Sequence, residues 1–468
     1  MGLGNSGGSV GGSGGVTGLA GRDREDERSR RMEKTRKWLI IRQNDLLLRS
    51  CFDQEIAAHW LHVLLKASAQ PRCTFKLKMA TVMETIFDTP ARILFGAGSR
   101  FRLSEELRRI QVSRVLVVTD EHLLATGVIR SFEERLKGED IEVSVFSEVQ
   151  PDPTDENVAG GLASLQCCGA QAVVAIGGGS VIDAAKVVAI AFTNSEPLEA
   201  FQGYHKVKNS GLPLLVIPTT AGTGSEATKA AVITDTKRTV KMMMLDAKLM
   251  PRISIVDYEL SMTMPAALTA YVGVDTLVHG MEAYLSKRSN GMTDPLAISC
   301  MQLTARHLLT AYREPANRTA REAMALAACQ GGLAFSNSSV CLVHGMSRPI
   351  GAIFHLAHGL SNAVLLAAVT RFSLAGAPER YAHISRQIGF CENGANDERA
   401  GELLVEGLEN LNEQLGIPKL RSLLKVDRSH FECYLRKMAE DALASGSPQN
   451  NPVVPTADEI IELYGEAW

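Results

Sequence analysis

Three histidines and one aspartate form the pattern in this sequence with the most chemical content. Asp275 and His279 lie four residues apart, and His344 and His358 each precede a glycine in apolar, small-residue segments. Residues four apart project from one face of a helix, so Asp275 and His279 can reach a single ion. Three imidazoles and one carboxylate suit Fe(II) or Zn(II) rather than Ca(II) or an ion that prefers thiolates.

The pair Asp275 and His279, taken alone, is weak support for a metal, because a chain with 11 histidines places some pairs at this spacing by chance. When Asp275 and His279 are considered alone, it is simpler to assume that both are solvated or are satisfied within the core than that they bind a metal. The two later histidines change the balance, since a titratable ring is costly to bury in an apolar segment without a partner. With all four residues considered together, a metal site is the preferred interpretation.

A glycine-rich loop is the second chemical feature. The apolar run 172–176 leads into four small residues, and a helical pattern follows them: Gly177, Gly178, Gly179 and Ser180. Glycines allow a sharp turn and a close approach of the backbone, and the start of a helix presents free N–H groups to an anion. A glycine triplet alone is more often a tight turn, but the strand before it and the helix after it favour a pyrophosphate site.

Two further segments are candidates for dinucleotide binding. Asp120 follows the apolar run 115–119, where a carboxylate can accept hydrogen bonds from an adenosine ribose and repel the extra phosphate of NADP. Capping of the helix that begins near Glu121 explains the same aspartate equally well. A Thr/Gly loop after the run 214–217 could line a phosphate or nicotinamide site, although a loop that only caps a helix would look the same.

Composition sets the broad class. A chain of 468 residues is too long for one ordinary core and predicts two domains. The net charge of −3 gives no reason to expect a nucleic-acid partner, and no apolar run of about 18 residues predicts a membrane span. Nine scattered cysteines without a Cys-x-x-Cys pair indicate reduced core residues and a cytoplasmic protein.

The elements that position these residues follow from the apolar pattern. Short β-branched runs alternate with helical patterns and predict a parallel sheet, with strands at 92–95, 115–119, 141–146, 172–176 and 214–217. The runs 232–234 and 241–244 predict a hairpin outside that sheet. Beyond Leu260 helical patterns such as 294–312 and 318–335 take over. We therefore expect an α/β domain over 79–260 and an all-α domain over 261–468.

The first 78 residues differ from the rest. A Gly/Ser-rich stretch and a mixed-charge run precede one short amphipathic segment, and the glycine-rich part cannot bury enough surface to fold. The segment has neither the order of a secretory signal nor the composition of a transit peptide. We expect residues 1–78 to be a disordered or non-native extension, with Met79 or Met83 as the true start.

Motif order and spacing from about Phe87 to Trp468 resemble the iron-containing (group III) alcohol dehydrogenases. The resemblance is nearest to the branch of lactaldehyde reductases and propanediol or butanol dehydrogenases. It is carried by four segments: Gly177 to Lys186, Pro218 to Thr223, Gly273 to Tyr284, and His344 to His358. The resemblance implies a Rossmann-like dinucleotide-binding domain, an all-helical domain, and a cleft between them for cofactor and metal.

Residue roles follow from this resemblance. It implies Asp275, His279, His344 and His358 as ligands of Fe(II), with Zn(II) possible. It implies NAD as the cofactor, with the pyrophosphate on Gly177, Gly178, Gly179 and Ser180, the ribose on Asp120, and the diphosphate–nicotinamide half on Thr219, Thr220 and Thr223. Asp183 is a further candidate beside the cofactor. Lys241 falls where the family places a cofactor-contacting lysine, although a surface lysine on a hairpin is an equally ordinary interpretation.

The implied activity is hydride transfer between NAD(H) and small primary alcohols or diols and their aldehydes, with the metal polarising the substrate oxygen. The resemblance also implies a homodimer or higher homo-oligomer. A lyase of the dehydroquinate-synthase kind is disfavoured, because it needs a more basic pocket and another ligand set. A catalytically silent binding protein is disfavoured because all four ligands are present.

One position departs from the family pattern. The family commonly has a second histidine four residues after His344, and this sequence has Arg348 there. Arginine stays protonated and cannot relay a proton. Arg348 is therefore expected to contact a polar or anionic group of substrate or cofactor, with a structural ion pair as the alternative. His355 is expected to be an accessory cleft residue, and Phe335 to be either a wall of the substrate pocket or part of the core.

Overall fold

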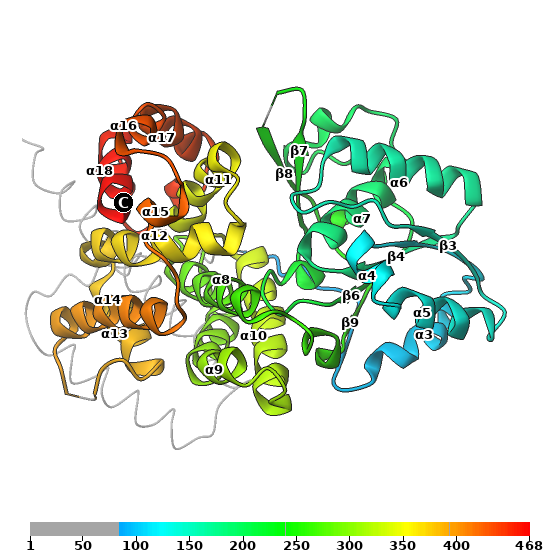
Figure 1. Ribbon diagram of the computed structural model, residues 1–468, viewed down its shortest axis with the longest axis horizontal. Helices are drawn as coiled ribbons and strands as arrows, with labels where there is room; N and C mark the ends of the chain where they lie inside the picture. The colour runs from blue at the N-terminus through cyan, green and yellow to red at the C-terminus, as the bar shows by residue number, and fades with distance from the viewer. Residues whose placement is uncertain (1–83, 239, 393) are drawn as a thin grey trace, which may run out of the picture. The chain divides into compact units, whose positions relative to one another are not determined.

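The computed structural model describes residues 84–238, 240–392 and 394–468. The extension expected over 1–78 lies outside these residues. An α/β region occupies the first part of the described chain and an all-helical region the second (Figure 1). This arrangement confirms the predicted fold class. The last strand ends at Val256, and the first long helix of the second region begins at Ala266.

Six parallel strands form the main sheet, in the order β1-β9-β6-β4-β2-β3. β4 and β6 are buried along their whole length, as expected for apolar strands that are covered on both faces. Five of the six strands were predicted, whereas β9 was missed because Ser254 interrupts its short apolar run. The strands are β1 (Arg92–Phe95), β2 (Arg114–Val118), β3 (Glu142–Phe146), β4 (Ala172–Gly177), β6 (Leu214–Pro218) and β9 (Ile253–Val256).

Crossover helices cover both faces of this sheet. Leu165 of α6 and Ile182 of α7 belong to the core on one face, and Leu107 of α3 and Phe132 of α5 belong to the core on the other. Consecutive parallel strands must be joined by crossover connections long enough to return to the same end of the sheet, and these helices provide them. They are α3 (Leu103–Arg109), α4 (Glu121–Ala125), α5 (Val128–Lys137), α6 (Asp155–Cys168) and α7 (Gly179–Ala191).

A small second sheet projects from the α/β region, and it confirms the predicted hairpin. β7 (Ala230–Asp235) pairs with β8 (Val240–Leu245) in antiparallel register, and β5 (Gly203–Tyr204) adds to β8 in parallel. The turn is stabilised by Asp235, whose Oδ1 accepts hydrogen bonds from the backbone N–H groups of Lys237 and Arg238 at 3.0 and 2.9 Å.

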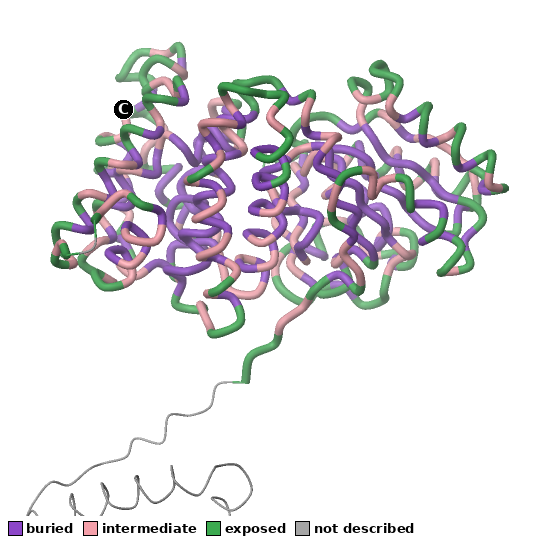
Figure 2. The backbone as a smooth tube through the Cα atoms, turned by 90° about the horizontal axis from the view of Figure 1, so that it is seen from below, coloured by how far each residue is buried: buried purple, intermediate pink, exposed green. Residues whose placement is uncertain are grey.

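The helical region is built around α8 (Ala266–Leu285), which packs against α9, α10 and α12. Most of α8 is buried, so polar side chains on it lie inside the protein. Figure 2 shows this concentration of buried backbone in the interior. The remaining helices are α9 (Asp294–Arg313), α10 (Arg318–Asn337), α11 (Leu342–Phe354), α12 (His358–Ser373), α13 (Pro378–Gln387), α14 (Asp397–Gln414), α15 (Leu420–Leu423), α16 (Arg428–Glu432), α17 (Leu435–Ala444) and α18 (Ala457–Ala467).

Within the described residues, the segment His358–Gly376 is long and apolar enough to cross a membrane, and 61% of it is buried inside the protein. The bent pair of α10 and α11 passes the same test if it is taken as one span. Core helices of this length and composition meet this criterion without a membrane, because burial against other helices also selects apolar residues.

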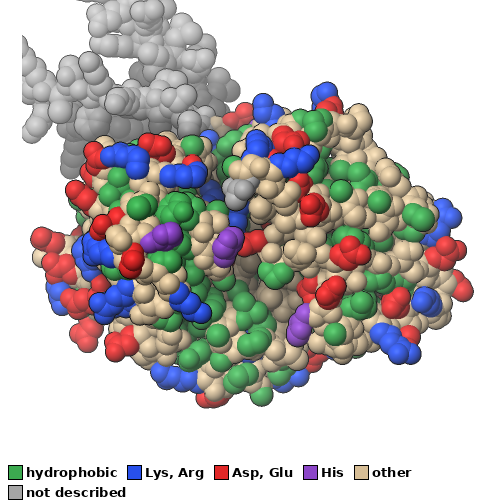
Figure 3. Space-filling model, turned by 45° about the horizontal axis from the view of Figure 1, so that its top comes forward, with side chains coloured by type: hydrophobic (Ala, Val, Ile, Leu, Met, Phe, Trp, Pro, Cys, Tyr) green, Lys and Arg blue, Asp and Glu red, His purple; other side chains and the backbone are tan. Residues whose placement is uncertain are grey.

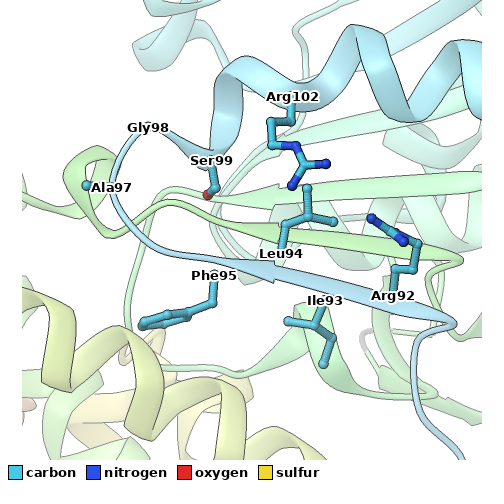
Figure 4. A pocket seen from close by; sticks show the side chains of 8 residues that line it. All are labelled: Arg92, Ile93, Leu94, Phe95, Ala97, Gly98, Ser99 and Arg102. Atoms are coloured by element: carbon cyan, nitrogen blue, oxygen red, sulfur yellow. The ribbon is translucent and has the colours of Figure 1, made fainter.

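A pocket lies at β1, at the edge of the sheet (Figure 4). Its lining comes from β1 and the turn after it, and includes Arg92, Leu94 and Arg102. Ile93 and Phe95 point to the opposite side of the strand from Leu94, as the two-residue period of a strand requires (Figure 4). None of the residues predicted to bind metal or cofactor lines this pocket.

Candidate metal centre and cofactor loops

The four predicted metal ligands come together from three helices. Asp275 and His279 lie one turn apart on α8, His344 lies on α11, and His358 is the first residue of α12. The Nε2 atoms of His279 and His344 are each 3.6 Å from Asp275 Oδ1, and His358 Nε2 is 3.9 Å from it. Asp275, His279 and His344 are buried and form a cluster able to hold an ion.

The chemistry of this donor set fits a divalent transition ion. Bonds of about 2.0–2.1 Å to a tetrahedral ion place neighbouring donors roughly 3.4 Å apart, close to the distances observed. Burial lowers the pKa of His279 to about 4, and partial burial together with the neighbouring His344, Lys241 and His279 lowers the pKa of His358. Both rings are therefore neutral at physiological pH, which is the protonation state that binds a metal. The residues present thus fit Fe(II) or Zn(II).

Glu282 orients one of these ligands. It lies on α8 one turn after His279, and its Oε2 accepts a hydrogen bond from His344 Nδ1 at 2.7 Å. The backbone N–H groups of Cys341 and Val343 also donate to its carboxylate, at 2.8 and 2.6 Å. With Nδ1 as the donor to Glu282, Nε2 of His344 carries the lone pair toward Asp275, as in the carboxylate–histidine pairs that support metal sites.

Asn362 lies at the centre of the ligand set. It is one turn after His358 on α12, and its Nδ2 donates to Asp275 Oδ1 at 2.6 Å. The same Nδ2 is 3.3 Å from Nε2 of His344 and 3.3 Å from Nε2 of His358. Its Oδ1 is buried without a hydrogen-bond partner among the described residues. Glu282 and Asn362 were not predicted to have a role, although each lies on the same helical face as a predicted ligand, and that spacing was the available signal.

Binding of a divalent ion is expected to release a proton from His344, and the affinity for the ion should rise with pH. Burial alone would lower the pKa of His344, but Glu282 and Asp275 raise it above its usual value. Below that raised pKa the metal-free ring is protonated on both nitrogens, so an ion must displace the proton on Nε2. Calorimetric titration with Zn(II) in buffers of different ionisation enthalpy measures this proton. Equal apparent enthalpies in all buffers would contradict it.

One side of the ligand set is apolar and the other is open. The ring of Phe335 stacks on His279 with centroids 4.4 Å apart, and Phe335 also packs against the hydrophobic core of the helical region. The side chain of His358 is 39% exposed, whereas that of Asp275 is 1% exposed. A substrate oxygen can therefore approach the centre from the side of His358. His355 is exposed at the end of α11, with φ 55°, and makes no hydrogen bond to these ligands.

Three loops meet at the carboxyl edge of the sheet, after the adjacent strands β2, β4 and β6. Thr119 Oγ1 donates to the carbonyl of Ile176 at 2.9 Å, and Thr219 N donates to the carbonyl of Gly177 at 3.0 Å. The strand order reverses between β2 and β4, and ligands of open α/β sheets bind at such a switch point. Gly178 is the N-cap of α7, so Gly179 and Ser180 present the first N–H groups of that helix at this edge.

The threonine loop packs directly on the glycine loop. Thr220 lies against Gly178 and Thr223 lies against Gly179. Asp120 caps α4, and its Oδ1 accepts a hydrogen bond from Leu123 N at 2.8 Å. Capping of α4 therefore uses only one of the two carboxylate oxygens of Asp120. Its Oδ2 makes no hydrogen bond to a described residue and is the atom available to a ribose hydroxyl.

Substituting Gly179 by Ala is expected to destabilise the protein by about 1–3 kcal/mol, because an added Cβ overpacks the loop. That Cβ would lie 2.8 Å from Thr223 Cγ2 and 2.9 Å from its Oγ1. Gly178→Ala is the matched control, since its Cβ would meet Thr220 at an ordinary 3.4 Å. Urea unfolding of the two variants measures the difference, and equal losses would refute the close contact as the cause.

Asp183 and Lys241 have protein partners. Asp183 accepts hydrogen bonds from Ser225 Oγ at 2.6 Å and Val232 N at 2.9 Å, which ties α7 to the threonine loop and to β7. Lys241 on β8 forms an ion pair with Asp152 at 2.7 Å, and its charge helps to keep the pKa of His358 low. Lys241 thus lies near the open side of the metal ligands, whereas Asp183 supports the loop.

The metal ligands and the cofactor loops are joined by a direct contact. Thr276, next to Asp275 on α8, donates its hydroxyl hydrogen to the carbonyl of Val272 at 2.9 Å, and the same Oγ1 lies 3.2 Å from the carbonyl of Gly222. A Cβ on Gly222 would come within 2.3 Å of Val272 Cβ, so only glycine lets the loop approach the helix this closely. In Figure 3 the surface is hollowed between the helical and α/β parts, and histidine side chains show at the edge of the hollow.

Comparisons with known proteins agree with this geometry. Residues 90–258 match the family model of iron-containing alcohol dehydrogenase, and residues 269–468 match the model of the C-terminal part of the Fe-containing alcohol dehydrogenase family. The chain therefore belongs to the iron-containing alcohol dehydrogenase family and is an oxidoreductase of that family.

Relatives across this family share the whole of the matched region. The NAD-dependent methanol dehydrogenase of Bacillus methanolicus is 35% identical, over 82% of this chain and 100% of the relative. The lactaldehyde reductase of Escherichia coli (strain K12) is 33% identical, over 80% of this chain and 97% of the relative. A crystal structure of 1,3-propanediol oxidoreductase superposes with a TM-score of 0.79 at 34% identity, and covers 82% of this chain and 100% of that structure.

Proposed function

We propose that this enzyme interconverts small primary alcohols or diols and their aldehydes by hydride transfer to and from NAD. We further propose Fe(II) as the ion held by Asp275, His279, His344 and His358, with Zn(II) as the alternative. The observation that carries the proposal is the close packing of the threonine loop on α8, the helix that holds Asp275 and His279. A Cβ on Gly222 would come within 2.3 Å of Val272 Cβ, and Thr276 Oγ1 lies 3.2 Å from the carbonyl of Gly222. A nicotinamide at that loop and a substrate oxygen at those ligands would be neighbours.

Each group of residues has a task in this reaction. A bound divalent ion supplies Lewis-acid polarisation of the substrate oxygen. Glu282 keeps His344 in the tautomer that offers Nε2, and Phe335 covers the ring of His279 and excludes water from that side. Asp120 Oδ2 and the glycine and threonine loops hold the dinucleotide, so that nicotinamide C4 and the substrate carbon stay aligned. Arg348 cannot accept a proton, so the substrate proton passes to water or to a ribose hydroxyl of the cofactor.

Metal analysis combined with an NADH oxidation assay on a panel of short aldehydes tests this proposal. We expect about one Fe(II) or Zn(II) per chain and NADH-dependent reduction that a chelator abolishes. A protein with neither ion and no turnover would overturn the proposal and favour a silent member of the fold. Turnover with NADPH in place of NADH would overturn the role given to Asp120.

We propose a cytoplasmic location and a homodimeric or higher homo-oligomeric state as the setting of this reaction. All cysteines among the described residues are free, which supports a reducing compartment. Light scattering of the purified enzyme measures the oligomeric state, and a monomeric mass would contradict the second proposal.

A further inference from the structure

Arg348 lies beside the metal ligands without a carboxylate of its own. It follows His344 by one turn on α11, so the two side chains project from the same face of the helix. Arg348 Nη1 donates to Ser447 Oγ at 2.8 Å, which is its single hydrogen bond to a described residue. A guanidinium has five N–H donors, so most of its donor capacity is free. Among the described residues no carboxylate lies within ion-pair distance, so no structural ion pair accounts for Arg348.

The nearby carboxylate of Glu282 already accepts hydrogen bonds from other groups. Both oxygens of Glu282 accept hydrogen bonds, from Val343 N on one side and from Cys341 N and His344 Nδ1 on the other. With a divalent ion bound, the carboxylates of Asp275 and Glu282 balance its two positive charges. The positive charge of Arg348 is then left over. Arg348 is half-buried, a partly desolvated charge without a partner is costly, and an anionic ligand would lower that cost.

Arg348 differs in its surroundings from two other basic residues, Arg288 and Lys241. Burial lowers the pKa of Arg348, and Glu282 and Tyr204 oppose that effect. Arg288 is exposed and lies over the ring of Tyr204 at 5.7 Å, so water can solvate its charge. Lys241 is paired with Asp152. Arg348 has neither full exposure nor an ion-pair partner among the described residues.

We propose that Arg348 binds the anionic end of the substrate, so that the enzyme acts on short aldehydes and alcohols that carry a carboxylate at the far end of the chain. This inference rests on the proposed function and narrows its substrate class. A guanidinium matches a carboxylate in a bidentate pair, which histidine at this position could not provide in its neutral form.

Matched aldehyde pairs test the proposal in the metal-loaded enzyme with NADH. The probes are 4-oxobutanoate against butanal and 5-oxopentanoate against pentanal, and the quantity compared is the ratio of kcat/KM within each pair. We expect the wild type to favour the carboxylated member, and Arg348→Ala to lower the ratio by about a hundredfold, in the range of a lost charged hydrogen bond. Arg348→Lys should recover part of the ratio, because the charge remains but the bidentate geometry is lost. Arg130→Ala, which removes an exposed arginine of α5, is the matched control and should leave the ratio unchanged.

Binding without turnover supplies a second readout. The affinity of the NADH-loaded enzyme for 4-hydroxybutanoate, compared with butan-1-ol, should fall in Arg348→Ala by a similar factor. An unchanged ratio in Arg348→Ala would overturn the inference and leave the proposed function standing. An equal rise of the NADH KM with both members of a pair would overturn it in favour of a cofactor contact. No reduction of any probe by the metal-loaded wild type would overturn the proposed function together with the inference.

Discussion

Replacement of Asp275 by Asn is expected to weaken binding of Fe(II) or Zn(II) by about a hundredfold or more and to abolish NADH-dependent turnover. Asp275 Oδ1 is the atom on which the other donors converge, with Nε2 of His279 and His344 at 3.6 Å. Asparagine has nearly the same shape and can still accept the hydrogen bond from Asn362, so the substitution removes mainly the negative charge. A divalent ion in a buried site then loses half of the carboxylate charge that balances it.

Metal content after dialysis and a competition titration with a chromophoric chelator measure this loss, and circular dichroism checks the fold. Asp441→Asn, at an exposed position of α17, is the control and should retain both metal and turnover. Full metal content in Asp275→Asn would refute Asp275 as a ligand.

Replacement of Glu282 by Gln is expected to lower the metal affinity by about 10–100-fold, although Glu282 touches no ion. Its carboxylate accepts from His344 Nδ1 at 2.7 Å and from two backbone N–H groups at the start of α11. Glutamine has one acceptor oxygen in place of two, and its NH₂ group cannot accept a proton from Nδ1. The ring of His344 is then free to take the other tautomer, which turns an Nε2–H toward Asp275.

The Glu282→Gln variant distinguishes a residue that orients a metal ligand from a residue that binds the metal itself. Glu282→Gln should lower the melting temperature as well as the affinity, because a buried N–H group is left without a partner. Turnover should return at high metal concentration, unlike that of Asp275→Asn. Glu379→Gln, in the exposed first turn of α13, controls for the loss of a negative charge. An affinity equal to that of the wild type would show that His344 keeps its tautomer without Glu282.

Much of the fold was predictable because its elements are encoded locally. Apolar runs such as 172–176 have the length and β-branched content of strands buried on both faces, and the helical patterns at 294–312 and 318–335 match α9 and α10 within two residues at each end. β9 and β5 carried too little local pattern, since they have four and two residues. Their pairing is decided by the strands beside them and not by their own composition.

The sequence by itself determined the donor types, because only a residue's identity decides whether it can offer an imidazole or a carboxylate to an ion. The spacing of Asp275 and His279 on one helix was likewise local. The tertiary structure alone decided which distant groups join them: the arrival of His344 and His358 from α11 and α12, the position of Asn362 between them, the hydrogen bonds of Glu282, and the lack of an ion-pair partner for Arg348 among the described residues. These features depend on how separate helices pack, and a residue's partners across such an interface are set by packing geometry that no local pattern specifies.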